Sequence, residues 1–346
     1  MIRLYSILFI GFIATGMSLI NACKKSDAIT SPRTTPLDFN IPDGWPQPNY
    51  TFTNNALTQE GFELGRKLFY DGILSKDGNF PCGSCHQQFA AFATFDHDLS
   101  HGFNNQFTTR NSPGLFNLVW HKEMHWDGAI NHIEVQALAP LTAPNEMAED
   151  VENVIKKLNS NPDYRNMFKA AYGDEIVNSQ RMLKALTQFM AAMVSSNSKY
   201  DKVKRGEATF TPAEQQGYQV FTSKCESCHK EPLFSDFSFR NNGLPVNPTL
   251  RDRGRMGITG LSSDSLKFKV PSLRNILLTF PYMHDGRFRS PLQVLDHYSD
   301  GIQSGPTLDP LLKNRIALTY QEKFHLMDFF RTLTDTSFVN DKRFSE

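Results

Sequence analysis

Four of the five cysteines in this 346-residue chain fall in two copies of one short motif, Cys-x-x-Cys-His. The copies are Cys82-Gly-Ser-Cys85-His86 and Cys225-Glu-Ser-Cys228-His229. Two thiols three residues apart lie on one turn of the backbone, where they can add to the two vinyl groups of a haem, and the adjacent histidine can bind the iron. The sequence therefore predicts two covalently attached haem c groups, with His86 and His229 as iron ligands.

Other uses of a Cys-x-x-Cys pair fit the sequence less well. A single pair also occurs in half of a zinc site, in thioredoxin-like redox centres and in disulfides, and two pairs can share one zinc ion through four thiolates. None of these sites requires a histidine at the next position. Both copies have one, which favours haem attachment.

The fifth cysteine, Cys23, ends an N-terminal segment that carries a basic residue and then an apolar run over residues 7–20. Residues 1–22 are therefore predicted to be a lipoprotein signal peptide, which leaves a lipid anchor at Cys23 in the membrane. The alternative is a transmembrane helix, although the run is shorter than the ~20 apolar residues that a span needs. Either prediction places the folded part in the periplasm or cell envelope.

The composition of the chain changes near residue 55. Residues 23–55 are rich in Ser, Thr, Pro, Asp and Asn, which predicts a flexible tether. What remains is long enough for two domains, predicted at 56–200 and 201–346. Lys plus Arg equals Asp plus Glu at 36 each, so the overall charge gives no reason to expect a nucleic-acid partner.

A similar helix-like stretch precedes each haem motif, at residues 58–69 and 211–221. Each begins with a threonine suited to N-capping and then places Gly-x-x-Leu/Val-Phe on one face. The glycines, Gly65 and Gly217, would allow a flat or bulky neighbour to approach closely. The recurrence favours a duplicated cytochrome c unit, in which the first copy carries an inserted loop before Cys82.

Apolar residues at helical spacing also occupy much of 149–202 and follow a capping box, Thr319-x-x-Glu322, near the end of the chain. No block of the sequence is rich in strand patterns. We therefore expect a mainly α fold with two cytochrome c-like haem domains and long loops.

Characteristic strings follow each haem motif. After the first come Arg110-Asn-Ser-Pro113, His125-Trp-Asp-Gly128, Ile133-Glu-Val-Gln136 and Pro144-Asn-Glu-Met147; after the second come Phe268-Lys-Val-Pro-Ser-Leu-Arg-Asn275 and Thr279-Phe-Pro-Tyr-Met-His-Asp-Gly-Arg287. In this order they resemble the bacterial dihaem cytochrome c peroxidases, a family that includes the MauG-type enzymes. The resemblance runs from about residue 56 to about residue 335.

The resemblance implies that the two haems have different roles. The haem at His86 would react with hydrogen peroxide, and the haem at His229 would receive electrons from a small donor such as cytochrome c or a copper protein. Glu134 matches the distal glutamate of the family, which can move a proton between the two peroxide oxygens. Thr279 and Pro281 match positions whose backbone carbonyls bind a calcium ion between the haems. The family also suggests a homodimer.

Two departures from the family pattern concern the iron sites. Met124 stands where many members have a glutamine, and a thioether cannot donate a hydrogen bond, so the distal pocket is modified or the equivalent group is displaced to His125. The usual axial methionine of the second haem falls on Tyr298, as in MauG-type enzymes. Met283 and Met256 are competing candidates for that ligand.

The best-known family members hold the first haem inactive with a loop histidine, and His97 and His101 lie in the corresponding loop. The sequence does not decide whether either binds iron. Three functions follow from these residues. The first is a peroxidase that reduces hydrogen peroxide to water, the second a MauG-like oxidase of a protein or organic substrate, and the third a dihaem electron carrier without turnover.

Overall fold

The computed structural model describes residues 33–346, so Cys23 and the predicted signal peptide lie outside the described residues. The described residues belong to one compact unit. Its regular structure is mostly helical, and the one pair of strands, β1 (Phe239–Arg240) and β2 (Phe268–Lys269), is two residues long on each side and antiparallel. The expectation of a mainly α fold is confirmed. No helix in this part of the chain is long and apolar enough to cross a bilayer.

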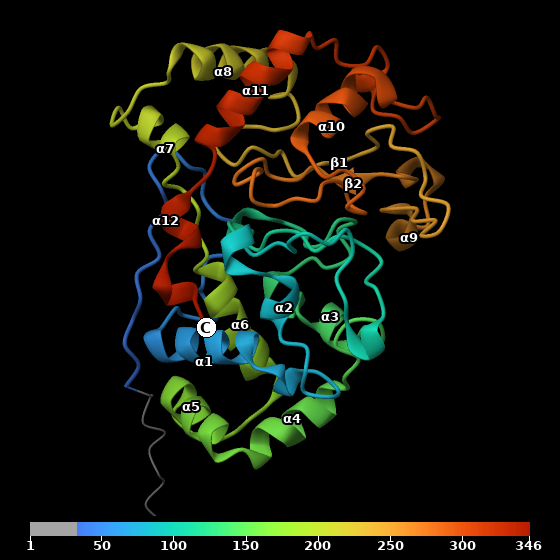
Figure 1. The fold of residues 1–346 in the computed structure, drawn as a ribbon. Helices are drawn as coiled ribbons and strands as arrows, with labels where there is room; N and C mark the ends of the chain where they lie inside the picture. The colour runs from blue at the N-terminus through green and yellow to red at the C-terminus, as the bar shows by residue number, and fades with distance from the viewer. Residues whose placement is uncertain (1–32) are drawn as a thin grey trace, which may run out of the picture. The chain divides into compact units, whose positions relative to one another are not determined.

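The helices alternate with long loops and single helical turns (Figure 1). In chain order they are α1 (Gln59–Tyr70), α2 (Cys82–Cys85), α3 (Leu138–Thr142), α4 (Val151–Ser160), α5 (Pro162–Tyr172), α6 (Ser179–Ala191), α7 (Lys199–Lys204), α8 (Pro212–Lys224), α9 (Met256–Thr259), α10 (Pro291–Asp296), α11 (Tyr320–Thr332) and α12 (Thr336–Val339).

The helix starts predicted from capping residues are confirmed. The Thr58 hydroxyl accepts a hydrogen bond from the Gly61 amide at the start of α1. Both α8 and α11 begin with a complete capping box, in which a threonine and a glutamate three residues later bond to each other's backbone amides. These side chains satisfy amides that the first helical turn leaves unpaired.

Two helix pairs repeat the same packing: α1 crosses α6, and α8 crosses α11. A Cβ atom at Gly65 would overlap the backbone carbonyl of Ala185 in α6, and one at Gly217 would overlap the carbonyl of His325 in α11. The close neighbour predicted for each glycine is therefore the backbone of a partner helix. The same device at the same position in both halves is what a duplicated unit would produce.

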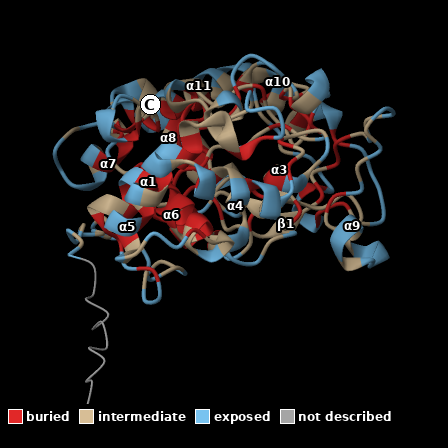
Figure 2. Ribbon diagram, turned by 90° about the horizontal axis from the view of Figure 1, so that it is seen from below, coloured by how far each residue is buried: buried red, intermediate tan, exposed pale blue. Residues whose placement is uncertain are grey.

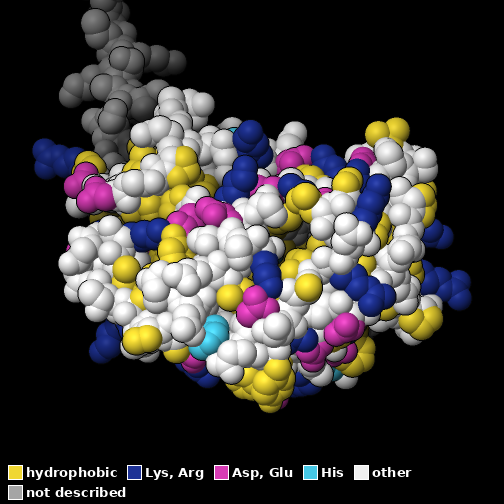
Figure 3. Space-filling model, turned by 90° about the horizontal axis from the view of Figure 1, so that it is seen from above, with side chains coloured by type: hydrophobic (Ala, Val, Ile, Leu, Met, Phe, Trp, Pro, Cys, Tyr) yellow, Lys and Arg dark blue, Asp and Glu magenta, His cyan; other side chains and the backbone are white. Residues whose placement is uncertain are grey.

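Each helix pair lies in its own hydrophobic core. Figure 2 shows buried residues along the inner faces of α1 and α6. The first core includes Phe62, Phe69 and Phe189, and the second includes Phe221 and Phe329. On the face seen in Figure 3, positive and negative side chains are interspersed, in keeping with the balanced composition.

The C-terminal residues do not stay with the second core. Phe338 and Phe344 pack into the first core, and the hydroxyl of Tyr70 in α1 donates a hydrogen bond to the Phe344 carbonyl at 2.6 Å. The C-terminal residues of the expected domain 201–346 therefore pack in the other half (Figure 1). Their aromatic side chains are buried there against the core that contains α1, and this burial of apolar surface is favourable.

Residues 33–55 do not behave as the expected tether. Leu37, Phe39, Trp45 and Tyr50 pack against the first core, and the indole N–H of Trp120 donates to the Pro46 carbonyl at 2.8 Å. These apolar residues are scattered among polar ones without a helix or strand period. Composition therefore did not reveal that several apolar side chains of this segment are partly buried against the first core.

We expect Gly65→Ala and Gly217→Ala each to lower the free energy of unfolding of the haem-loaded protein by ~1–3 kcal/mol, the usual cost of overpacking. Helix propensity alone would favour alanine by about 1 kcal/mol. Gly257→Ala in α9 is the matched control, because nothing lies within 4 Å of the added Cβ. Denaturant unfolding monitored by circular dichroism measures the effect. If all three variants unfolded at the same denaturant concentration, the helices would not cross at these glycines.

Candidate functional site

The first Cys-x-x-Cys-His motif forms a single helical turn. Cys82 and Cys85 bound α2, and the backbone amide of His86 donates to the Cys82 carbonyl at 3.0 Å. The His86 Nδ1 atom lies 2.7 Å from the Phe92 carbonyl, which leaves Nε2 free for a metal. Burial lowers the pKa of His86 to about 4, so the ring is neutral, as an iron ligand must be.

The second motif has the same form at the end of α8. Cys225 caps the helix, and the backbone amide of His229 donates to the Cys225 carbonyl at 3.0 Å. The His229 Nδ1 atom lies 3.1 Å from the Pro271 carbonyl, and burial lowers the pKa of His229. All four motif cysteines are free thiols. Because the described residues contain no cluster of three or more Cys, His, Asp or Glu side chains, the two pairs do not converge on a shared zinc ion.

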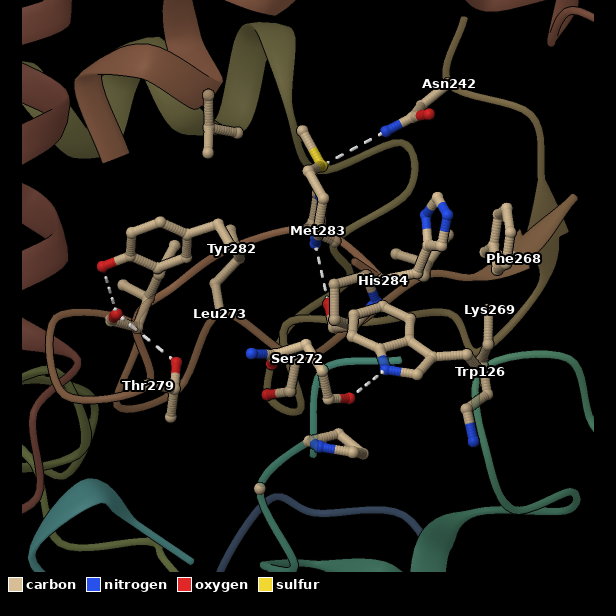
Figure 4. A pocket seen from close by; sticks show the side chains of 18 of the residues that line it. Trp126, Asn242, Phe268, Lys269, Ser272, Leu273, Thr279, Tyr282, Met283 and His284 are labelled. Carbon is tan, nitrogen blue, oxygen red and sulfur yellow. Dashed lines mark hydrogen bonds between the residues drawn. The ribbon is translucent and has the colours of Figure 1, made fainter. Parts of the chain in front are cut away.

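One cavity of about 550 Å³ extends between the two motifs. His86 lines one part, and Cys225, Cys228 and His229 line another. Figure 4 shows part of its wall, in which Trp126 of the first half faces residues of the second half such as Phe268 and His284. Cys82 and Cys85 are not among the lining residues, so only the second thiol pair borders the cavity directly. A largely apolar cavity with a motif histidine at each end fits two haem groups.

Glu134 lies on the helical turn Ile133–Val135, half-buried, and its carboxylate accepts a hydrogen bond from the Tyr50 hydroxyl at 2.8 Å. It is not among the residues that line the cavity, whereas Gln136 two residues later is. Sequence reasoning missed Tyr50, because nothing in the N-terminal segment marks it as a partner of the distal carboxylate. The role of Glu134 stays a prediction.

The structure brings two of the three proposed ligands of the second haem to the cavity. Tyr298 lies in the π-helical turn His297–Gly301 and lines the cavity, where burial raises its pKa to about 12. Met283 lines it too, with its sulfur accepting a contact from the Asn242 amide at 3.5 Å (Figure 4). Met256 begins α9 and is not a lining residue, so the geometry favours the other two.

The two loop histidines, His97 and His101, are engaged with their own loop. His97 is exposed, with Nδ1 3.2 Å from the Phe95 carbonyl, and the Nδ1 of His101 lies 2.6 Å from the Asn105 side-chain oxygen. The two rings contact each other at a centroid distance of 5.5 Å. Neither lines the cavity, so in this conformation the loop supplies no ligand opposite His86.

Thr279 and Pro281 both line the cavity near Tyr282, whose hydroxyl donates to the Ile276 carbonyl at 2.9 Å (Figure 4). The described residues near them include no cluster of acidic side chains that would mark a calcium site. A site made of backbone carbonyls leaves no such mark, and the calcium ion stays a prediction.

An ionic bridge at the cavity wall, centred on Arg110, links the two halves. Arg110 donates to Asp127 at 2.5 Å and, through two nitrogens, to Asp252 at 2.6 and 2.9 Å. Lys269 nearby is buried and donates to the Glu123 carbonyl at 2.7 Å, and burial lowers its pKa to about 8. These contacts hold residues 110–127 of the first half against the second half.

Comparisons with known proteins agree with this geometry. The profile of the di-haem cytochrome c peroxidase family matches residues 59–209. The methylamine utilization protein MauG of Methylorubrum extorquens is 32% identical over 299 residues, which cover 85% of this chain and 83% of that protein. This chain belongs to the di-haem cytochrome c peroxidase family. Cytochrome c551 peroxidase of Nitrosomonas europaea is 37% identical over 228 residues, covering 65% of this chain and 68% of that protein.

Solved structures of the family share the fold. A MauG-like protein associated with microbial copper homeostasis superposes with a TM-score of 0.81 at 34% identity, covering 89% of this chain and 99% of that one. The dihaem peroxidase BthA of Burkholderia thailandensis superposes at 0.71 with 21% identity, covering 92% and 95%. The expected family and the expected oxidoreductase class are confirmed. Because relatives are named both peroxidase and MauG, the names leave the reaction and the partner open.

We expect the double variant Cys82→Ser/Cys85→Ser to lose one covalent haem, because a serine hydroxyl forms no thioether with a vinyl group. The intact mass of the exported protein, compared with wild type, gives the number of attached haems. Ser84→Ala changes a residue between the two cysteines and should keep both haems. A wild-type protein without added porphyrin mass would contradict the assignment of both motifs.

Proposed function

We propose that this protein is a dihaem c-type peroxidase that reduces hydrogen peroxide to water with electrons from a small redox protein, a cytochrome c or a copper protein. The observation that carries the proposal is the single cavity lined by both motif histidines, His86 and His229. When bound, haem iron supplies a site for peroxide at one end and an electron store at the other. The relatives named cytochrome c peroxidase support the same reaction.

A peroxide-reactive iron needs a vacant position, and the loop geometry supports one at the first motif. Neither His97 nor His101 lines the cavity, so neither would occupy the position that peroxide would take on a haem held by His86. Glu134 is proposed to contribute to proton handling there. Its carboxylate shares a hydrogen bond with Tyr50, and that contact would have to break for the carboxylate to reach the cavity.

The second candidate is a MauG-like oxidase of a protein or organic substrate, and Tyr298 is the observation that favours it. A phenolate ligand stabilises oxidised iron, whereas a methionine ligand raises the reduction potential. Tyr298 lies in the cavity with the second motif. If Tyr298 binds the second iron, that haem would accept electrons from a donor less readily and would hold oxidising equivalents better.

Several further properties belong to the proposal. The protein would work in the periplasm or cell envelope, anchored through a lipid on Cys23, and would form a homodimer as the family suggests. A calcium ion would lie at the carbonyls of Thr279 and Pro281. The two haem domains would divide near residue 200, with the C-terminal residues returning to the first.

Steady-state kinetics test the main proposal. The haem-loaded protein should oxidise two reduced cytochrome c molecules per hydrogen peroxide, because reduction of the O–O bond to two waters takes two electrons. The Cys82→Ser/Cys85→Ser variant, without the first haem, should show no turnover. Two low-spin haems that stay inert to peroxide even after half-reduction would identify an electron carrier instead.

Tyr298→Met separates the peroxidase from the MauG-like oxidase. If Tyr298 binds iron, the substitution should raise the potential of the second haem and change its visible spectrum, since a neutral thioether replaces an anionic phenolate. Met283→Leu is the control and should leave both unchanged. Spectroelectrochemistry measures the potential. An unchanged second haem in Tyr298→Met, with a shift in Met283→Leu, would assign the ligand to Met283.

A further inference from the structure

Lys269, in the short strand β2 of the second half, extends its side chain to the first half. Its backbone amide donates to the Trp126 carbonyl at 2.7 Å, and its side-chain nitrogen donates to the Glu123 carbonyl at 2.7 Å. In Figure 4 the side chain lies beside Trp126, with its nitrogen pointing toward the ribbon of the first half. These two contacts hold the ammonium group between the halves.

The charge of Lys269 is buried, because the residue is only 9% exposed. Burial lowers the pKa of Lys269 to about 8, which leaves the ammonium group mostly charged at pH 7. A buried charge is costly unless an opposite charge compensates it. The two groups that contact the ammonium are a backbone carbonyl of Glu123 and the ring of His121, and neither carries a negative charge.

The acidic side chains nearest to Lys269 are bonded to other cations. The Glu123 carboxylate accepts a hydrogen bond from Arg255 at 2.9 Å, and the Asp127 carboxylate accepts from Arg110. Both carboxylates raise the pKa of Lys269 from a distance. Among the residues that the structure describes, however, no carboxylate forms an ion pair with Lys269.

The other Lys and Arg side chains that line the cavity are compensated. Arg110 and Arg240 each donate to two carboxylates. Lys224 pairs with Glu322 at 2.6 Å. Of the cations on this wall, Lys269 is therefore the one without a carboxylate partner in the described part of the chain.

His121 supplies a second hydrogen-bond donor beside Lys269. An ammonium group can only donate, so the Nδ1 atom of His121, 3.4 Å away, accepts and the ring proton lies on Nε2. Burial lowers the pKa of His121 well below its usual value, and the charge of Lys269 acts in the same direction, so the ring is neutral. The ring packs on Phe237 at a centroid distance of 4.3 Å. Both His121 and Lys269 line the cavity.

We propose that Lys269 and His121 form a carboxylate-binding site on the cavity wall. A carboxylate supplies the missing negative charge, and its two oxygens can accept from the third ammonium N–H and from the imidazole N–H. Two sources bring a carboxylate to this cavity: the propionate of an attached haem, or a free organic acid that enters as a ligand. The site does not depend on which reaction the protein catalyses.

Resonance Raman spectroscopy of the haem-loaded protein tests the first source, because the propionate bending band reports hydrogen bonds to the propionates. Lys269→Met removes the charge but keeps an unbranched side chain. If a propionate occupies the site, this band should shift in Lys269→Met. Lys267→Met is the matched control: Lys267 bonds to Asp264 at 3.3 Å, does not line the cavity, and its loss should leave the band unchanged.

Isothermal titration calorimetry of the same proteins with sodium acetate tests the second source. If the site takes a free carboxylate, the propionate band should stay unchanged and wild type should bind acetate. Lys269→Met should then weaken that binding ~10–100-fold, the usual worth of a charge-assisted hydrogen bond. Lys267→Met should bind acetate as wild type does.

His121→Phe removes the second donor, keeps a ring against Phe237, and carries both measurements if Lys269→Met does not fold. An unchanged propionate band together with acetate binding that is absent, or equal in wild type and variant, would overturn the proposal. Neither measurement involves turnover. A protein that never reduces peroxide but shows the band shift would support the site and refute the peroxidase.

Discussion

The bridge from Arg110 to Asp127 and Asp252 is the interaction on which the site depends. One guanidinium holds a loop of the first half and a loop of the second half together, and its two partners are largely buried. Breaking a buried ion pair strands the remaining charge and typically costs about 3–5 kcal/mol. The bridge joins Asp127, two residues after the cavity-lining His125, to Asp252 of the second half.

Local signals in the sequence predicted much of the structure. The haem motifs and the capping boxes of α8 and α11 depend on residues close together in the chain. The recurrence of Gly65 and Gly217 predicted a close neighbour, but not that this neighbour is the backbone of α6 or α11. The resemblance to the family added Tyr298, which lies in the cavity with the second motif. A capping box or an attachment motif is a complete physical unit within five residues, and it can therefore be recognised without knowledge of the fold.

The features that the sequence did not reveal depend on distant contacts. The Glu134 carboxylate meets Tyr50 from a segment whose composition resembles a linker, and the residues that pack that segment come from the first core. Trp126, beside His125, is held by the Asn111 carbonyl and by the Lys269 amide of the second half. No periodicity or short motif records such partners, because only the folded chain brings them together.

The C-terminal residues pack in the first half, although they follow both motifs in the chain. Phe338 and Phe344 fill the first core, and the Gln88 side chain, just after the first motif, donates to the Asp341 carbonyl at 2.7 Å. Because synthesis runs from the N-terminus, Cys82 and Cys85 leave the ribosome before Phe338 and Phe344 do. The first core therefore lacks two of its aromatic side chains while the first motif is already present.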